Sequence, residues 1–578
     1  MSATYFTNIN PDLLARLPLS ARRVLEFGCG EAPLAAEYKL RNPLAHYTAI
    51  EIHAPSAAVA RGRVDRLLEG DVEQMSDAEI GGPFDLALMG DVLEHLSDPW
   101  RALRRMHALL APGAHFVCCV PNISHWSALA ELMTGQWPSR DSGLFDRTHL
   151  RFFTLDSLSA ILRETGFRSL KVRPRQFLLD EAKAKTWIPK LADAAAALGI
   201  DRNAFIGRAT ALQYVVTTEK PRDTPTAVAR ISLHAMAPRF MDVRTRLPAE
   251  ALDAEPGLSV TVHQRDLRLP QVARESPHVA IVQRLGAVTE AQWLGWLADA
   301  IANDWAVVAE LDDHPDLIAA VHGRADDPGK WLSVRAAHAA QTSTPALADA
   351  FRPHNPEVAA FGNAAFRLPP FRPARTGPAR VFFGALNREA FSGPIARALT
   401  PFLAAHPETE FTVVHDRAFS DGLATDRKQF HAATGYDAYL DLMSGCDIAL
   451  MPLEGTSPEM FKSDVKFVEA SSRSLATIAS PPVYGDTIRD GETGLIAAPP
   501  DDWPAALGRL VAEPSLRERL ARNAWEYVRA ERMFAGQVGV RRDWYLSVWA
   551  RRRELTAALT GRYPALGEML AARGVALP

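Results

Sequence analysis

Two closely spaced glycines, Gly28 and Gly30, are the first residues of this chain whose type and spacing suit a ligand. They follow an apolar run that starts at Val24, and a segment compatible with a helix comes after them. A buried parallel strand that turns sharply into a helix has this pattern, and its turn can face a ligand. Ordinary turns contain such pairs as well, so the glycines alone leave the ligand open.

Two acidic residues farther along fit a nucleoside at this turn. Glu51 ends the next apolar stretch, about twenty residues after the glycines, where a carboxylate can accept hydrogen bonds from both ribose hydroxyls. Asp71 follows a third short strand and is placed to contact an adenine edge, although a solvated turn aspartate would have the same sequence. This stretch therefore predicts a nucleoside-containing cofactor, and an NAD-binding unit is one alternative.

A second cluster of candidate binding residues lies near the other end of the chain. Lys462, Lys466 and Glu469 follow an apolar strand, in the segment K-S-D-V-K-F-V-E-A. Lysines at a helix N-terminus can hold a diphosphate, and a glutamate one turn later can reach ribose hydroxyls. Lys466 and Glu469 share one helix face, which is also the spacing of an ordinary surface ion pair.

Composition limits the classes of protein to which the chain can belong. Its 578 residues, 47% apolar and 23% charged, predict two to four globular domains, and a net charge of −4 argues against a nucleic-acid partner. We expect a cytoplasmic protein without a transmembrane segment, since no apolar run reaches the ~18 residues that cross a bilayer. Four cysteines inside or beside apolar runs predict reduced core residues, and no metal is expected.

The alternation of apolar strands and amphipathic helices predicts an α/β fold with three Rossmann-like domains. In the first, residues 1–220, we expect strands at 23–27, 46–51, 84–90, 115–121, 169–174 and 211–217. A polar segment, 221–228, is the predicted linker. Later strands are expected at 229–234, 259–263, 279–283, 306–310, 339–342, 358–361, 381–384, 411–415, 448–451 and 476–479. The Pro- and Arg-rich segment 369–380 reads as a hinge between domains 229–372 and 373–578.

Residues 24–174 resemble class I S-adenosylmethionine-dependent methyltransferases. The motifs that carry the resemblance are V-L-E-F-G-C-G-E-A, the acidic Glu51, F-D-L-A-L-M-G-D-V-L-E-H-L, a Pro-Gly turn at 112–113 and a closing Pro-Asn. The resemblance implies S-adenosylmethionine as cofactor, with its methionine end at Glu26, Gly28 and Gly30, its ribose at Glu51 and its adenine near Asp71. Asp91 is counted with these donor-binding residues. Two positions depart from the family pattern, Ala32 and Ala114, where glycines are usual.

Three histidines are candidates for the catalytic base of this methyltransferase-like domain. Methyl transfer to oxygen or nitrogen often needs a base to take the acceptor's proton. His149 lies in D-R-T-H-L-R-F-F-T, which resembles a lid segment of the family, and we name it first. His95 and His125 follow the ends of two predicted strands. Each of the three is also compatible with a purely structural role.

Residues 229–540 resemble retaining glycosyltransferases of the GT-B fold, of the family 4 or group 1 type. S-D-V-K-F-V-E-A and I-R-D-G-E-T-G-L carry this second resemblance. It implies a nucleotide-sugar donor held by Gly384, Arg388, Lys462, Lys466 and Glu469, without a metal. Phe461 stands where the family has the first glutamate of its E-x7-E motif, which is a departure at the sugar contact. Asp313 and His314 are candidates for the acceptor side.

Together the two resemblances predict a bifunctional enzyme that methylates and glycosylates a glycan or surface polysaccharide. One alternative is a methyltransferase whose second half binds glycan or nucleotide passively. Another is a non-catalytic scaffold in a polysaccharide assembly complex. The sequence leaves the sugar, the methylated atom and the oligomeric state open.

Overall fold

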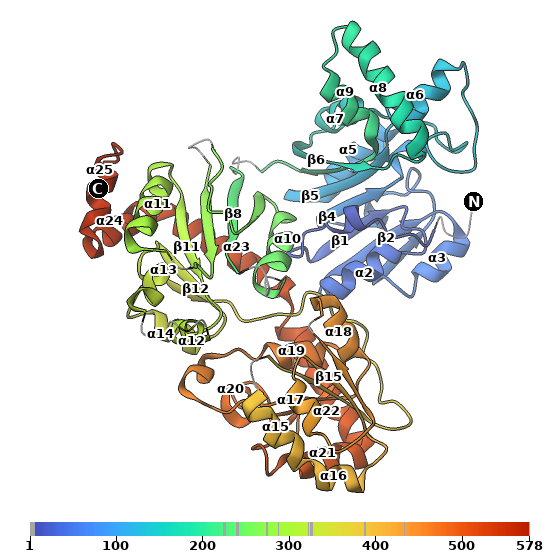
Figure 1. Ribbon diagram of the computed structural model, residues 1–578. Helices are drawn as coiled ribbons and strands as arrows, with labels where there is room; N and C mark the ends of the chain where they lie inside the picture. Colours follow the sequence, from blue (N-terminus) through green and yellow to red (C-terminus); the bar gives the residue numbers. More distant parts are fainter. Residues whose placement is uncertain are drawn as a thin grey trace. The chain divides into compact units, whose positions relative to one another are not determined.

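The computed structural model describes residues 6–222, 227–237, 242–272, 276–286, 288–321, 323, 327–386, 389–432 and 434–576. The chain divides into two compact units, described separately below (Figure 1). Unit 1 comprises residues 1–226 and 253–257, and unit 2 comprises the rest. The division after residue 226 falls inside the predicted linker, 221–228. No helix in the described ranges is long and apolar enough to cross a membrane.

Unit 1 is built on a seven-stranded sheet of strand order β3-β2-β1-β4-β5-β7-β6. The strands are β1 (Arg23–Phe27), β2 (His46–Glu51), β3 (Arg66–Glu69), β4 (Phe84–Gly90), β5 (Leu110–Pro121), β6 (Arg168–Gln176) and β7 (Ala211–Glu219). Strands β1 to β5 are parallel, and β7 runs antiparallel to both β5 and β6. Because β1 lies between β2 and β4, the strand order reverses at β1, and ligands of such sheets bind at the carboxyl ends beside that point.

Helices α2, α3, α5 and α7 connect these strands. The helices of unit 1 are α1 (Pro11–Leu14), α2 (Pro33–Arg41), α3 (Ala54–Ala60), α4 (Asp77–Ile80), η1 (Leu93–His95), α5 (Pro99–Leu109), α6 (Trp126–Met133), α7 (Leu155–Glu164), α8 (Glu181–Ala197) and α9 (Arg202–Thr210). Helix α5 shows why the sequence folds this way. Asp98 caps it by accepting from the Arg101 N–H, and Leu103, Met106 and Leu109 share its buried face.

Helices α6, α8 and α9 pack on one another beyond the sheet and form a small cap with its own apolar core (Figure 1). That core includes Trp126 of α6, Ala184 and Leu191 of α8, and Ala209 of α9.

Strand β5 differs most from its predicted bounds. Strand β5 begins at Leu110 instead of residue 115, so the Pro-Gly pair at 112–113 lies inside the strand and forms no free turn. The Gly113 N–H donates to the Lys220 carbonyl at 2.8 Å, and the pairing of β4 with β5 shifts register between Phe84 and Leu86. The pair therefore marks an irregularity of the strand, because a neighbouring segment supplies the hydrogen bond that a turn would have supplied.

Unit 2 contains two parallel six-stranded sheets. The first has the order β13-β12-β11-β10-β8-β9 and consists of β8 (Ala229–Ala235), β9 (Leu258–Gln264), β10 (His278–Gln283), β11 (Ala306–Glu310), β12 (Ala339–Thr342) and β13 (Val358–Ala360). The second has the order β16-β15-β14-β17-β18-β19 and consists of β14 (Arg380–Gly384), β15 (Glu410–Val414), β16 (Lys428–His431), β17 (Ile448–Met451), β18 (Ala476–Ala479) and β19 (Leu495–Ile496). The second order is that of a Rossmann sheet.

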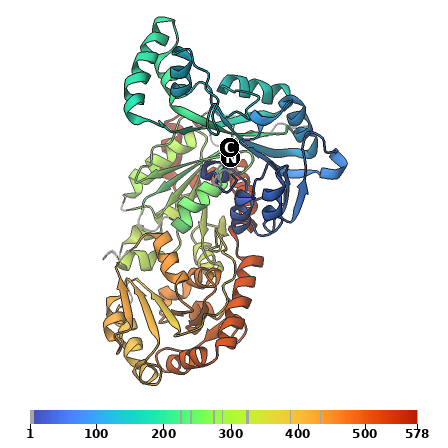
Figure 2. The same ribbon diagram turned by 90° about the vertical axis from the view of Figure 1, so that its right-hand side faces the viewer.

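Helices lie on both faces of this second sheet, whose yellow to orange strands are seen in Figure 2. The helices of unit 2 are η3 (Asp242–Arg246), α10 (Leu247–Asp253), α11 (Glu290–Ala302), α12 (Pro315–Val321), η4 (Pro328–Trp331), α13 (Leu332–Arg335), α14 (Pro345–Phe351), α15 (Glu389–Ala398), α16 (Thr400–Ala405), α17 (Arg417–Gly422), α18 (Tyr436–Ser444), η5 (Ser457–Phe461), α19 (Val465–Ser472), α20 (Pro481–Tyr484), α21 (Trp503–Ala512), α22 (Pro514–Glu531), η6 (Phe534–Gly536), α23 (Val538–Ala550), α24 (Arg552–Arg562) and α25 (Pro564–Ala571).

The last helices pack on the first sheet of unit 2, which differs from the predicted domain 373–578. Leu559 of α24 and Leu566 and Leu570 of α25 belong to the same buried cluster as Trp293 of α11. The Tyr545 hydroxyl of α23 also donates to Gln341 at 2.7 Å, at the end of β12. Amphipathic periodicity shows that these helices are buried on one face but does not show which sheet covers that face.

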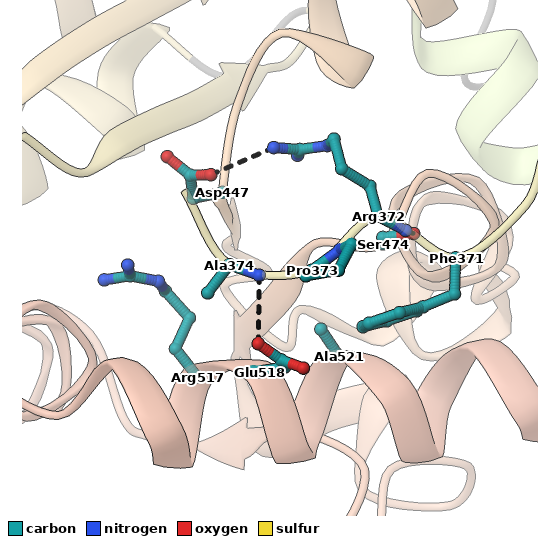
Figure 3. Close-up of a pocket in the computed structure, with 9 residues that line it drawn as sticks. All are labelled: Phe371, Arg372, Pro373, Ala374, Asp447, Ser474, Arg517, Glu518 and Ala521. Atoms are coloured by element: carbon teal, nitrogen blue, oxygen red, sulfur yellow. Dashed lines mark hydrogen bonds and ion pairs between the residues drawn. The ribbon is translucent and has the colours of Figure 1, made fainter. Parts of the chain in front are cut away.

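The predicted hinge is held against the second sheet over part of its length (Figure 3). Arg372 lies 3.2 Å from Asp447, the Ala374 N–H donates to Glu518 at 3.1 Å, and Trp525 donates to the Pro369 carbonyl at 2.9 Å. The small pocket between this segment and α22 is lined by packing residues of the segment, α22 and the second sheet. None of the predicted ligand-binding residues that the structure describes lines it.

Candidate functional site

The turn after β1 has the bare backbone that the sequence predicts. Gly28 and Gly30 have φ angles of +68° and +58°. A Cβ on Gly28 would lie 2.6 Å from Val92 Cγ2, and one on Gly30 would lie 3.0 Å from the Phe6 carbonyl oxygen. Only glycine fits both the dihedral angles and the space. Ala32, at the position where the family has a third glycine, is fully buried and also has a left-handed φ of +57°. An alanine in this conformation costs about 1–2 kcal/mol of backbone strain.

Glu51 lies at this turn and is buried. Its Oε2 accepts from the Gly30 N–H at 2.7 Å and its Oε1 accepts from the His53 N–H at 2.8 Å. The carboxylate thus lies beside the glycines at the carboxyl end of β2, where the sequence predicts the ribose contact. Glu26 is buried beneath the turn and accepts from the Tyr47 hydroxyl at 2.9 Å. Burial raises the pKa of Glu26 to about 8, against the opposing effect of that hydrogen bond.

Asp71 and Asp91 occupy different settings. Asp71 accepts from the Glu73 N–H at 2.8 Å, two residues on, so its carboxylate also stabilises the local turn. Asp91 directly follows β4 with a left-handed φ of +53°, and its Oδ1 accepts from the Gln213 side chain at 2.6 Å. Burial raises the pKa of Asp91 to about 6. Gln213 of β7 was not identified from the sequence, because nothing in a strand pattern marks one glutamine as the partner of a distant aspartate.

Two of the three predicted histidines lie together. The rings of His95 and His149 are 4.8 Å apart between centroids in an edge-to-face arrangement. Burial lowers the pKa of both rings, so both are neutral at pH 7. The ring centroid of Phe152 lies 6.2 Å from that of His149.

His125 lies elsewhere and has a structural setting. It is fully buried at the start of α6, with Nδ1 2.8 Å from the Ser127 hydroxyl and Nε2 2.8 Å from the Phe177 carbonyl. Both ring nitrogens are engaged, so this ring is placed to anchor α6 to the segment before α8. These hydrogen bonds favour a structural role for His125 over the role of a base.

Glu94 joins the histidine pair, although the sequence reasoning gave it no role. Glu94, His95 and His149 each offer a ligand atom that lies within 4.8 Å of the other two. The V-L-E-H motif contains the first two, but its pairing with a histidine so far along the chain becomes visible only in the fold. A carboxylate and two imidazoles are a donor set that can hold a metal ion.

Part of unit 1 is similar to a known protein family. Residues 3–172 match the protein-family model described as "Methyltransferase domain". Residues 3–172 of unit 1 are thus similar to methyltransferases. The match ends at residue 172 and therefore says nothing about unit 2.

Two relatives of known name are each similar to about a quarter of this chain. The ubiquinone biosynthesis O-methyltransferase of Ruegeria pomeroyi is 30% identical over 163 residues, which are 27% of this chain and 63% of that protein. The malonyl-[acyl-carrier protein] O-methyltransferase of Geobacter sulfurreducens is 31% identical over 154 residues, 26% of this chain and 57% of that protein. The chain thus spans less than two thirds of either relative.

Among solved structures, a SAM-dependent methyltransferase from Archaeoglobus fulgidus is 17% identical, with a TM-score of 0.25 over 34% of this chain and 86% of the other.

Outside the methyltransferase domain, the structure brings three of the five predicted nucleotide-sugar residues together. Lys466 donates to the Gly384 carbonyl at the carboxyl end of β14, and Glu469 accepts from the Tyr436 hydroxyl at 3.0 Å. Burial raises the pKa of Glu469 to about 7. Because β14 lies between β15 and β17, this cluster is at the reversal point of a Rossmann sheet. Arg388 lies outside the described residues.

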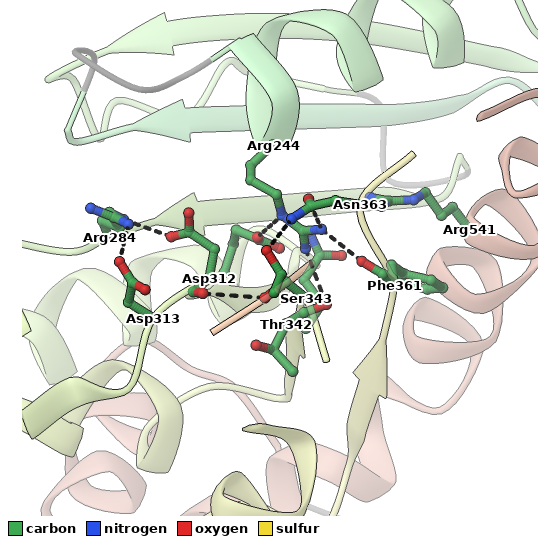
Figure 4. Close-up of polar contacts among 12 residues, drawn as sticks. Arg244, Arg284, Asp312, Asp313, Thr342, Ser343, Phe361, Asn363 and Arg541 are labelled. Carbon is green, nitrogen blue, oxygen red and sulfur yellow. Dashed lines mark hydrogen bonds and ion pairs between the residues drawn. The ribbon is translucent and has the colours of Figure 1, made fainter. Parts of the chain in front are cut away.

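Lys462 is directed differently and pairs with Asp313 at 2.9 Å, at the end of the first sheet. There Arg284 holds Asp312 and Asp313 at 2.7 and 2.9 Å (Figure 4). Phe461 stacks on His314, with centroids 4.6 Å apart. These contacts join the ends of the two sheets within unit 2.

A buried ion pair lies beside that group. Arg244 and Glu310 meet at 2.8 Å with almost no exposure, and Arg244 also donates to the Phe361 and Thr342 carbonyls (Figure 4). Neither arginine of this network, Arg244 or Arg284, was identified from the sequence, since both lie outside any recognised motif.

Proposed function

We propose that unit 1 transfers a methyl group from S-adenosylmethionine to an oxygen of an acceptor molecule. The observation that carries this proposal is the bare glycine turn with the Glu51 carboxylate beside it, at the reversal point of the sheet in a matched methyltransferase domain. The choice of oxygen follows the two named relatives, both of which are O-methyltransferases.

The residues present fit S-adenosylmethionine. The cradle at Gly28 and Gly30 is one that a Cβ would fill, and Glu51 is a buried carboxylate with the geometry to accept from a ribose diol. Bound there, the cofactor would supply an electrophilic methyl group. The chain's own part would be to hold the acceptor oxygen in line and to help its proton leave, and we assign this part to His95 and His149, whose rings lie together.

Calorimetry with S-adenosylhomocysteine tests the donor site. We expect one molecule to bind per chain, and Glu51→Ala to weaken binding by roughly tenfold to a hundredfold, because it removes charge-assisted hydrogen bonds. The matched control is Glu181→Ala, an exposed glutamate of α8, which should leave the affinity unchanged. Absence of heat with the wild type, or equal affinities for both variants, would contradict the proposal.

For unit 2 we propose transfer of a sugar from a nucleotide-sugar donor to a glycan or surface polysaccharide, with retention of configuration. The cluster of Gly384, Lys466 and Glu469 supports it, because a cation and a carboxylate at that sheet end suit a diphosphate and a ribose. The helices that return from the second sheet to the first also favour two sheets that work as one enzyme. The whole chain would then be a cytoplasmic bifunctional enzyme.

Thermal shifts with UDP, GDP and dTDP test this second activity. One of the three should raise the melting temperature of the wild type, and Glu469→Gln should abolish that rise. Glu492→Gln, an exposed glutamate, is the control that should keep it. If no nucleotide stabilises the protein, the proposed sugar transfer is wrong. The remaining hypothesis is then a protein with methyltransferase activity alone. If S-adenosylhomocysteine does not bind either, the remaining hypothesis is a non-catalytic scaffold.

A further inference from the structure

We propose that Glu94, His95 and His149 form a site for a divalent transition-metal cation that binds the acceptor hydroxyl. The existence of the site is argued from these residues alone. Its role in holding the acceptor rests on the methyl transfer proposed above.

Glu94 contributes a buried carboxyl group to the site. It is 1% exposed, and within the described part of the chain neither of its side-chain oxygens has a hydrogen-bond partner. Leaving a carboxylate buried and unpaired is costly, so native proteins pair such groups or use them to bind metals. The two imidazoles are the groups that converge on it.

The two imidazoles are held in the tautomer that ligates a metal through Nε2. His95 Nδ1 lies 3.2 Å from the Thr148 carbonyl and 3.1 Å from the Thr148 hydroxyl. That hydroxyl donates its own proton to Asp146 at 2.7 Å, so it must accept from His95. The proton of His95 is therefore on Nδ1, and the lone pair is on Nε2. His149 Nδ1 faces the Leu144 carbonyl at 3.3 Å and has the same tautomer. Metal-bound histidines are usually oriented in this way.

Backbone hydrogen bonds fix the lid to the Glu94 segment. The N–H groups of Leu150 and Arg151 donate to the Glu94 carbonyl at 2.8 and 3.0 Å. The ligand atoms, within 4.8 Å of one another, need to move by only about 1 Å to stand ~3.4 Å apart, the spacing around Zn²⁺ at ~2.1 Å. Three protein ligands leave at least one position open for an exogenous oxygen.

The site adjoins the donor turn. Val92, two residues before Glu94, is the side chain that closes on Gly28. On the lid, the half-exposed ring of Trp137 lies 4.9 Å from that of Phe152, which neighbours His149. These rings offer an apolar surface for the rest of the acceptor. We therefore infer an acceptor with a hydroxyl on an apolar or ring-shaped framework.

The chemistry that the cation supplies is Lewis-acid activation. A hydroxyl bound to it would lose its proton to solvent at a lower pH than a free hydroxyl, which would favour attack of its oxygen on the methyl carbon. The new O–CH3 bond forms as the S–CH3 bond breaks, and the sulfur keeps the electron pair as a thioether. Neither histidine then has to act as the base, which agrees with their placement around one point.

Titration of the full chain with metal ions tests the proposal. After treatment with EDTA and dialysis, we expect calorimetry to show one Zn²⁺ per chain, bound more tightly than Mg²⁺ because two ligands are nitrogens. His149→Ala and Glu94→Gln should each weaken Zn²⁺ binding by roughly a hundredfold. His46→Ala, an exposed histidine at the start of β2, is the control that should bind as the wild type does.

Two further readouts separate a metal ligand from a residue needed only for folding. Without metal, Glu94→Gln should melt at or above the wild-type temperature, since glutamine is close in size to glutamate and has no charge to bury. Zn²⁺ should raise the melting temperature of the wild type and of His46→Ala but not that of Glu94→Gln. No Zn²⁺ binding below millimolar concentration, or equal binding by His149→Ala, would overturn the proposal. S-adenosylhomocysteine binding measured on the same samples reports on the donor site independently.

Discussion

At the scale of residues, the proposed donor site contains carboxylates that the fold keeps out of water. Glu26 shows this most clearly: it is buried below the glycine turn, and burial outweighs the Tyr47 hydrogen bond and raises its pKa to about 8. The neighbouring Glu51 carboxylate adds to the rise. Glu26 is therefore mostly protonated in the folded protein at pH 7, although the same residue would be ionised in the unfolded chain.

This difference predicts a pH-dependent stability of unit 1. The stabilisation by protonated Glu26 is complete below its ordinary pKa of 4.5 and is lost as pH rises to about 8, by up to ~1.4 kcal/mol per pH unit. Glu26→Gln cannot ionise, so its stability relative to the wild type should increase across this window. Urea unfolding of both proteins at pH 5, 6.5 and 8 measures the difference. A constant difference would show that Glu26 has an ordinary pKa.

At the scale of elements, the spans of the strands were predicted better than the packing of the helices on the sheets. The spans of β1, β2 and β4 agree with the prediction residue for residue, because short apolar runs bounded by turn residues determine them. β16 and β19 were missed, since the first is half-exposed and the second has only two residues. Local pattern also could not show that α24 and α25 cover the first sheet of unit 2, a long-range packing choice.

The packing of α24 on the first sheet of unit 2 predicts that one leucine contributes strongly to the free energy of unfolding. Leu559 of α24 is fully buried in the cluster around Trp293, so Leu559→Ala should lower the free energy of unfolding of unit 2 by about 2–5 kcal/mol. Val540→Ala in α23, where the side chain is exposed, should change it by less than about 0.5 kcal/mol. Denaturant titration of both variants provides the check. Equal stabilities would mean that the C-terminal helices are not part of this core.

At the scale of the whole molecule, the chain joins a methyltransferase domain to a second unit with two parallel sheets. The α/β class and the position of the donor turn follow from the sequence. The cluster of Glu94 with two histidines did not, because it depends on how segment 146–154 packs against η1. Lys462 was predicted as a phosphate ligand, yet its pairing with Asp313 depends on how the two sheets of unit 2 meet.

The central claim is that the turn at Gly28 and Gly30 holds the methionine end of S-adenosylmethionine, with Glu51 on the ribose. A crystal structure of the full chain grown with S-adenosylhomocysteine tests it most directly. We predict density for the ligand at the carboxyl ends of β1 and β4, with both ribose hydroxyls within hydrogen-bond distance of Glu51. Density at another place, or none at a saturating ligand concentration, would contradict the account.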